Sequence, residues 1–158
     1  MITVFIEYDR ISKEQAKIDE NRVSQTALAV FEKQTIDNSE ITIIFTNNDH
    51  IREINREYRE KDYPTDVISF AYMDDPFPGE GSESDTYLGD IYISVEKAAE
   101  QADEFGSSCD QEIDRLVIHA ILHLMGYDHE KGEKEAELMF SLEDSISAEC
   151  EQRRNEQQ

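Results

Sequence analysis

Residues 119–129 of this 158-residue chain read His119-Ala-Ile-Leu-His123-Leu-Met-Gly126-Tyr-Asp-His129 and include three of its four histidines. Residues four apart lie on the same face of an α-helix, so His119 and His123 can reach one ion. Gly126 can adopt the left-handed conformation that ends a helix, which turns the chain and returns His129 to the same ion. The spacing predicts a metal site of three imidazoles with a fourth position open, as in catalytic zinc sites.

Two other interpretations of this stretch are weaker. Apolar residues flank the histidines and bury the helix, and three buried imidazoles without a shared partner would be costly, which disfavours an ordinary core role. Zinc proteases of the H-E-x-x-H-x-x-G-x-x-H type have the same histidines and glycine at these offsets. Ala120 stands where their glutamate acts as general base, and alanine cannot accept a proton. The sequence therefore predicts the ligand set of such enzymes without their proteolytic chemistry.

Length and composition fit a single domain, residues 1–150, followed by a polar tail at 151–158. No apolar run is long enough to cross a membrane and no secretory signal is evident, so a cytoplasmic protein is expected. The net charge of −22 argues against general affinity for nucleic acid, because phosphates would be repelled over most of the surface. The segment 74–85 is acidic, contains proline and glycine, and is expected to be an exposed mobile loop.

Apolar periodicity and cap residues indicate strands in the first part of the chain and helices in the last. The predicted strands are 2–7, 41–45, 66–71 and 87–93. The predicted helices run over about 19–32, from a cap at Asn47, Asn48 or Asp49 to Arg59, from a cap at Ser94 to Ala102, and over 110–125 and 133–150. This order favours an α/β or α+β layer of about four strands, with the metal-binding helix near the C-terminus.

Four polar residues outside the histidine triad are further candidates for the site. Arg59 ends a helix just before a turn, where its guanidinium can point into a cleft, although the charges around it also fit an ordinary solvated face. Asp66 can make a turn or orient Arg59. Asp90 lies in an apolar strand and needs a partner, such as a backbone amide or a histidine. Asp128 can fix the tautomer of a ligating histidine or cap the last helix.

Taken together, these segments resemble the YbeY family of bacterial ribonucleases, also called ribosomal RNA maturation factors. The matching segments are Asn55-x-x-Tyr58-Arg59, Pro64-Thr-Asp66-Val-Ile-Ser-Phe70, Leu88-Gly-Asp90-Ile-Tyr-Ile-Ser94 and His119-x-x-x-His123-Leu-x-Gly126-Tyr-Asp-His129. The likeness extends over residues 40–140, and the histidine motif is its most specific part. Ala120 departs from the family, where many members have glycine, but both residues are small and the ligand geometry should survive.

The resemblance implies a zincin-like fold, with a mostly parallel sheet beside the metal helix. It also implies a metal-dependent endoribonuclease that cleaves single-stranded RNA in small-subunit (16S) ribosomal RNA maturation and ribosome quality control. His119, His123 and His129 match the metal ligands of the family, and Arg59 matches its functionally important arginine. Three imidazoles suit zinc, although nickel, copper and iron also accept them. Arg59 and His119 are therefore the expected catalytic residues. The expected partners are single-stranded ribosomal RNA and the small ribosomal subunit with its proteins.

Two alternative functions stay open at this point. The acidic surface would attract basic ribosomal proteins more than naked RNA, which fits a non-catalytic assembly factor whose metal is structural. The protease-like spacing of the ligands fits a metal-dependent hydrolase of another substrate, weakened by Ala120. Within the ribonuclease hypothesis, the nucleophile is either a metal-activated water or the RNA 2′-hydroxyl.

Overall fold

The computed structural model describes residues 1–72 and 86–157. The acidic segment 74–85, predicted to be a loop, lies outside these residues. The elements follow one another along the chain as β1 (Ile2–Tyr8), α1 (Lys13–Ala16), α2 (Glu20–Lys33), β2 (Ser39–Thr46), α3 (Asn48–Arg59), β3 (Val67–Ala71), β4 (Tyr87–Ser94), α4 (Val95–Phe105), α5 (Cys109–Leu124), the 3-10 turn η1 (His129–Lys131) and α6 (Glu133–Glu156).

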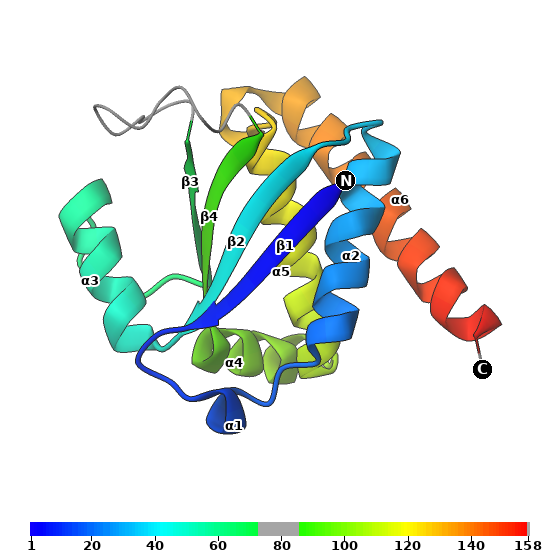
Figure 1. The fold of residues 1–158 in the computed structure, drawn as a ribbon. Helices are drawn as coiled ribbons and strands as arrows, with labels where there is room; N and C mark the ends of the chain where they lie inside the picture. Colours follow the sequence, from blue (N-terminus) through cyan, green and yellow to red (C-terminus); the bar gives the residue numbers. More distant parts are fainter. Residues whose placement is uncertain (73–85, 158) are drawn as a thin grey trace.

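The strands form one four-stranded sheet in the order β1-β2-β4-β3 (Figure 1). β1 pairs parallel with β2 and β2 with β4, whereas β3 pairs antiparallel with β4 at the edge. The predicted mostly parallel sheet is therefore confirmed. Ile43, Ile44 and Phe45 of β2 are all buried, and this strand lies in the interior of the sheet between two parallel neighbours. Its sequence alternates at first, with Thr42 between Ile41 and Ile43, and is apolar only over residues 43–45.

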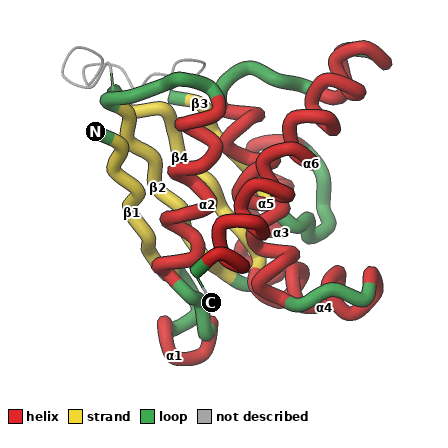
Figure 2. The backbone as a smooth tube through the Cα atoms, turned by 90° about the vertical axis from the view of Figure 1, so that its right-hand side faces the viewer, coloured by secondary structure: helices red, strands yellow, loops and turns green. Residues whose placement is uncertain are grey.

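Helices cover the two faces of the sheet unequally. α2, α5 and α6 lie on one face and enclose the main core with β1, β2 and β4 (Figure 1, Figure 2). α3 lies on the other face, where Ile51, Ile54 and Ile68 form a smaller cluster against Phe70 and Tyr92. No helix within the described ranges is long and apolar enough to cross a membrane.

Cap residues begin α3 and α4 where the sequence predicts them. The Asn47 side chain accepts a hydrogen bond from the His50 backbone N–H at 2.9 Å, and the Ser94 hydroxyl accepts one from Lys97 at 3.2 Å. Each cap satisfies a backbone N–H group that has no partner within its helix. α1 and η1, which the sequence-based prediction lacks, have four and three residues and are too short to show apolar periodicity.

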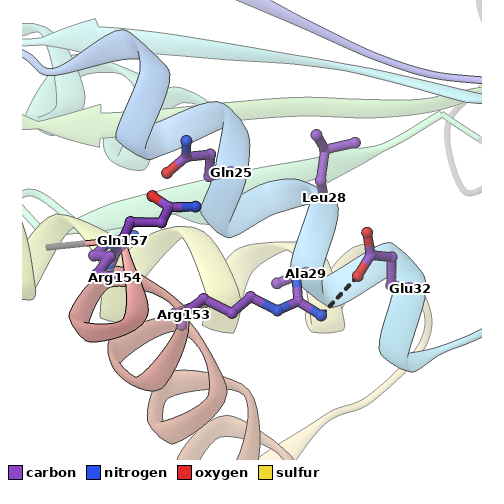
Figure 3. Close-up of a pocket in the computed structure, with 8 residues that line it drawn as sticks. Gln25, Leu28, Ala29, Glu32, Arg153, Arg154 and Gln157 are labelled. Carbon is purple, nitrogen blue, oxygen red and sulfur yellow. Dashed lines mark hydrogen bonds and ion pairs between the residues drawn. The ribbon is translucent and has the colours of Figure 1, made fainter.

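The C-terminal segment corrects one prediction, because α6 continues to Glu156 where a polar tail is predicted from residue 151. Arg153 donates to Glu32 of α2 at 2.9 Å, as Figure 3 shows. Arg154 donates to Asp114 of α5 and to Thr26 of α2, both at 2.8 Å. These contacts join the last turns of α6 to two other helices. A polar sequence is therefore compatible with a docked helix when its charges meet partners in the fold.

Candidate metal centre

α5 presents His119 and His123 from a helix that is fixed at both ends. At its start, the Ser108 hydroxyl accepts from the Gln111 backbone N–H at 3.1 Å, and the Gln111 side chain accepts from the Ser108 N–H at 2.9 Å. This reciprocal pair is a capping box. The apolar face of the helix is enclosed in the main core, while the His119 side chain keeps 26% of its surface exposed. The two histidines therefore lie at the rim of the core.

Gly126 ends α5 as the sequence predicts, with a positive φ of 101°. Its N–H donates to the His123 carbonyl at 3.0 Å, and the Tyr127 N–H donates to the Leu122 carbonyl at 3.1 Å. These two bonds are the pair that defines a Schellman motif, and glycine favours its left-handed position because it has no Cβ. The turn directs residues after Gly126 back toward the helix.

Asp128 places His129 by capping the turn η1. Its Oδ1 accepts from the Glu130 backbone N–H at 2.9 Å, and this hydrogen bond holds the pKa of the Asp128 carboxyl below its usual value. Of the two roles predicted for Asp128, the structure shows the capping role, although at η1 and not at the last helix. The next residue, His129, lies with its ring against His119.

The three imidazoles are neighbours but are spaced more widely than a bound metal needs. The ring centres of His119 and His129 are 5.4 Å apart, and those of His119 and His123 are 6.5 Å apart. Two imidazoles that share a tetrahedral zinc ion have ring centres roughly 5 Å apart. Within residues 1–72 and 86–157, no three His, Cys, Asp or Glu side chains are arranged to hold an ion. Joint ligation therefore needs the His123 ring to approach His119 by roughly 1 Å.

Hydrogen bonds at Nδ1 leave the Nε2 atoms of both α5 histidines available. His123 Nδ1 lies 2.9 Å from the Tyr127 carbonyl oxygen, and His119 Nδ1 lies 2.6 Å from Glu143 Oε1. A carbonyl oxygen only accepts, so Nδ1 of His123 carries the proton, and an ionised Glu143 imposes the same tautomer on His119. Each Nε2 lone pair can then bind a metal, as is usual for ligating histidines. The donor set fits a divalent ion such as zinc.

Glu143, on α6, is the residue of this cluster that sequence reasoning missed. Glu143→Gln is expected to weaken metal binding by about 10- to 100-fold, because an amide orients His119 less firmly and makes its Nε2 less basic than a carboxylate does. Titration against a chelating dye measures the affinity. Glu149→Gln, on the same helix, removes only an exposed ion pair with Arg153 and should leave the affinity unchanged. Equal affinities in both variants and the parent would contradict the role of Glu143.

Arg59 ends α3 beside the edge of the sheet. Its Nη2 donates to the Ser69 carbonyl of β3 at 3.4 Å, and the residue is exposed. β3 also contacts α5, the helix that carries the first two histidines of the cluster. The structure therefore brings Arg59 to the strand that lies between α3 and the histidine helix, with its guanidinium accessible from solvent.

Asp66 does not orient Arg59, which corrects one of its two predicted roles. Its Oδ1 accepts from the Val67 backbone N–H at 2.8 Å, and its Oδ2 accepts from Gln101 at 3.2 Å and lies 3.6 Å from Arg115. Asp66 therefore supports the turn into β3 and ties it to α4 and α5. A sequence gives no sign of such partners, because they lie 35 and more residues away.

Asp90 has a side-chain partner other than the backbone amide or histidine that the sequence suggested. It accepts a hydrogen bond from the Tyr87 hydroxyl. It lies two residues before Tyr92, which packs under α3, and alternate residues of a strand share a face. Asp90 is therefore on the α3 face of the sheet, and α5 is on the other.

Comparisons with known proteins agree with this architecture. A family model described as Endoribonuclease YbeY matches residues 8–151. Endoribonuclease YbeY of Persephonella marina is 48% identical over 124 residues, 78% of each chain, and that of Bacillus licheniformis is 43% identical over 144 residues, 86% of this chain and 90% of its own. The solution structure of TM1509 from Thermotoga maritima has a TM-score of 0.62 at 29% identity and covers 96% of this chain and 93% of its own. The chain belongs to the endoribonuclease YbeY family.

Proposed function

We propose that the protein is a metal-dependent endoribonuclease that cleaves single-stranded RNA during maturation of small-subunit (16S) ribosomal RNA in the cytoplasm. The observation that carries this proposal is the histidine cluster, in which His119 and His123 have Nδ1 bound to acceptors and Nε2 available beside His129. The names of the relatives, each an endoribonuclease, support RNA as the substrate class.

His119, His123 and His129 would hold one divalent metal, with zinc the expected ion. Bound there, it would polarise a phosphoryl oxygen and lower the pKa of water. The Tyr127 carbonyl and the Glu143 carboxylate fix the tautomers of two of these rings before any substrate arrives. Such preorganisation keeps the site from having to reorder its ligands during the reaction.

Arg59 would bind the phosphate of the RNA backbone. Its planar guanidinium can donate two parallel hydrogen bonds to phosphate oxygens and balance negative charge that develops during cleavage. A chain with a net charge of −22 repels RNA over most of its surface. An exposed arginine at the end of α3 is therefore a place where RNA can approach with local attraction.

A peptidase function has little support from the structure. Ala120, which replaces the general-base glutamate of the zinc proteases, is 1% exposed and packs in the main core. A carboxylate there would be buried among apolar side chains, at a high cost in solvation.

The test of the proposal is cleavage of a single-stranded RNA by the purified protein and by two arginine variants of α3. Arg59→Ala is expected to lower kcat by about 10²–10³, the usual effect of removing one preorganised donor to developing charge. Arg56→Ala, which removes an exposed arginine from the same helix, should retain the activity. Metal content by mass spectrometry and circular dichroism should be the same in all three proteins.

Cleavage that is equally weak in all three proteins would point to a contaminating nuclease and contradict the enzymatic proposal. If the protein then sedimented with small ribosomal subunits and did so after the metal was removed, an assembly factor would be the better description.

A further inference from the structure

A pocket of about 190 Å³ on the α3 face of the sheet has a wall of aromatic rings and one carboxylate. It is lined by Ile54, Tyr58, Phe70, Ala71, Tyr72, Tyr87, Gly89, Asp90 and Tyr92. Its volume is below the roughly 300–1,000 Å³ of sites that enclose a drug-sized ligand, so it suits a single flat ring system.

The rings of this pocket meet edge to face. Tyr58 and Phe70 have centres 5.4 Å apart with an angle of 74°, and Tyr72 and Tyr87 have centres 5.9 Å apart with an angle of 89°. In an edge-to-face pair, the ring that presents its edge to its partner does not have its own two faces covered by that partner. Tyr58 is 63% exposed at the pocket, where an uncovered aromatic face can stack with an unpaired nucleobase.

Asp90 gives the pocket a fixed acceptor. The Tyr87 hydroxyl donates to its Oδ1, and Thr42 Oγ1 lies 2.7 Å from the Tyr87 hydroxyl oxygen, so the carboxylate is anchored through two side chains. Burial and the bond to Asp90 hold the pKa of Tyr87 well above its usual value, so its hydroxyl stays a donor. An ionised carboxylate only accepts hydrogen bonds, with about four acceptor positions in all. It favours a base edge with adjacent N–H donors and repels phosphate.

We propose that this pocket binds an unpaired guanine of the RNA substrate, with the base against the aromatic rings and its N1–H and N2–H₂ donated to Asp90. Among the four bases of RNA, only guanine presents two adjacent donors on its Watson–Crick edge. The proposal rests on the proposed ribonuclease function and adds a base preference to it.

The position of the pocket connects it with both parts of the proposed site. Tyr58 packs against Phe70 and the Arg59 guanidinium donates to the carbonyl of Ser69, the preceding residue of β3, so a base at Tyr58 has its backbone near the guanidinium. Gly89, with a φ of 154°, lines the pocket, and a Cβ there would collide with the Phe70 carbonyl oxygen and lie 2.9 Å from Leu124 Cδ2. Leu124 follows His123 directly on α5. Because Gly89 has no side chain, only the backbone of β4 lies between the pocket and the C-terminal end of α5.

Binding of nucleoside 5′-monophosphates to the intact, metal-loaded protein tests the pocket without any cleavage step. In NMR titrations, guanosine monophosphate is expected to bind at least about tenfold more tightly than the adenosine, cytidine and uridine analogues, as a paired hydrogen-bond contact allows. Asp90→Asn should remove this preference, and Tyr58→Ala should weaken binding of all four. Tyr63→Ala, which truncates a tyrosine that is 52% exposed outside the pocket, should change nothing.

Cleavage mapping then separates failure of the pocket from failure of the proposed function. On RNA oligomers with one guanine in a uridine background, cuts are expected at a fixed distance from the guanine, and Asp90→Asn should spread them evenly. Guanosine monophosphate binding without any RNA cleavage would overturn the ribonuclease proposal, but the proposal that the pocket binds guanine would stand. Cleavage without guanine preference, together with equal binding of the four nucleotides, would overturn the proposal that the pocket binds guanine. If no nucleotide bound and Asp90→Asn weakened the association with small ribosomal subunits, the pocket would be a protein-docking surface and not a guanine site.

Discussion

His123→Ala is expected to lose both bound metal and RNA cleavage, while His50→Ala keeps both. His123 supplies one of three imidazoles, and the two that remain bind a metal ion too weakly to keep it in competition with water. His50 is the fourth histidine of the chain, and its ring pairs with Thr46 at 2.8 Å and packs against Tyr92 on the α3 side. Metal per chain, measured by mass spectrometry, and cleavage of a single-stranded RNA report the two losses.

Denaturant unfolding of the same variant distinguishes a catalytic metal from a structural one. His123→Ala should unfold at nearly the same denaturant concentration as the metal-free parent, because the ring is partly exposed at the helix end. Readdition of zinc should restore cleavage to the chelated parent and not to the variant. Full cleavage by metal-free His123→Ala would contradict the assignment of this residue.

Asp114→Ala is expected to destabilise the fold by about 3 kcal/mol, since it leaves two arginines that are largely buried without their partner. Asp114 is 7% exposed. Its carboxylate lies 2.8 Å from both Arg22 and Arg154 and accepts from the Thr26 hydroxyl at 3.0 Å. These partners come from α2 and α6, so one side chain of α5 holds three helices together. Urea unfolding followed by circular dichroism measures the change.

Asp62→Ala is the matched control, because Asp62 also pairs with an arginine, Arg52, at 2.9 Å. That pair is about half exposed on both sides, and ion pairs exposed to solvent add little to stability. Asp114→Asn should fall between the two, since it keeps the shape and one acceptor oxygen but loses the charge. If Asp114→Ala lowered the free energy of unfolding no more than Asp62→Ala does, Arg22 and Arg154 would have found other partners in the fold.

The sequence predicted the order of the long elements well because their signals are local. β2 is marked by its β-branched residues, and the starts of α3 and α4 are marked by Asn47 and Ser94. The end of α5 at Gly126 follows from the same kind of information, because a Schellman turn involves only neighbouring residues. For the same reason the sequence could predict that His129 returns to the vicinity of His119.

The partners of charged side chains could not be predicted in the same way. Asp66 reaches Gln101 and Arg115, and Arg154 reaches Asp114, over 35 to 49 residues of chain. Several carboxylates in each segment are equivalent in sequence, and only the packing of the helices selects one of them. The extension of α6 beyond residue 150 has the same cause, since it depends on contacts with α2 and α5.

The sequence by itself determined the histidine spacing, the turn at Gly126 and the apolar faces that make a sheet with helices on it, because each depends on periodicity and backbone preference within about ten residues. The tertiary structure alone decided that Glu143 orients His119, and that Asp90 turns away from the histidines into an aromatic pocket under α3. Those relations join side chains from separate elements, and their energies depend on distances and burial that exist only once the sheet and its two helical layers have packed.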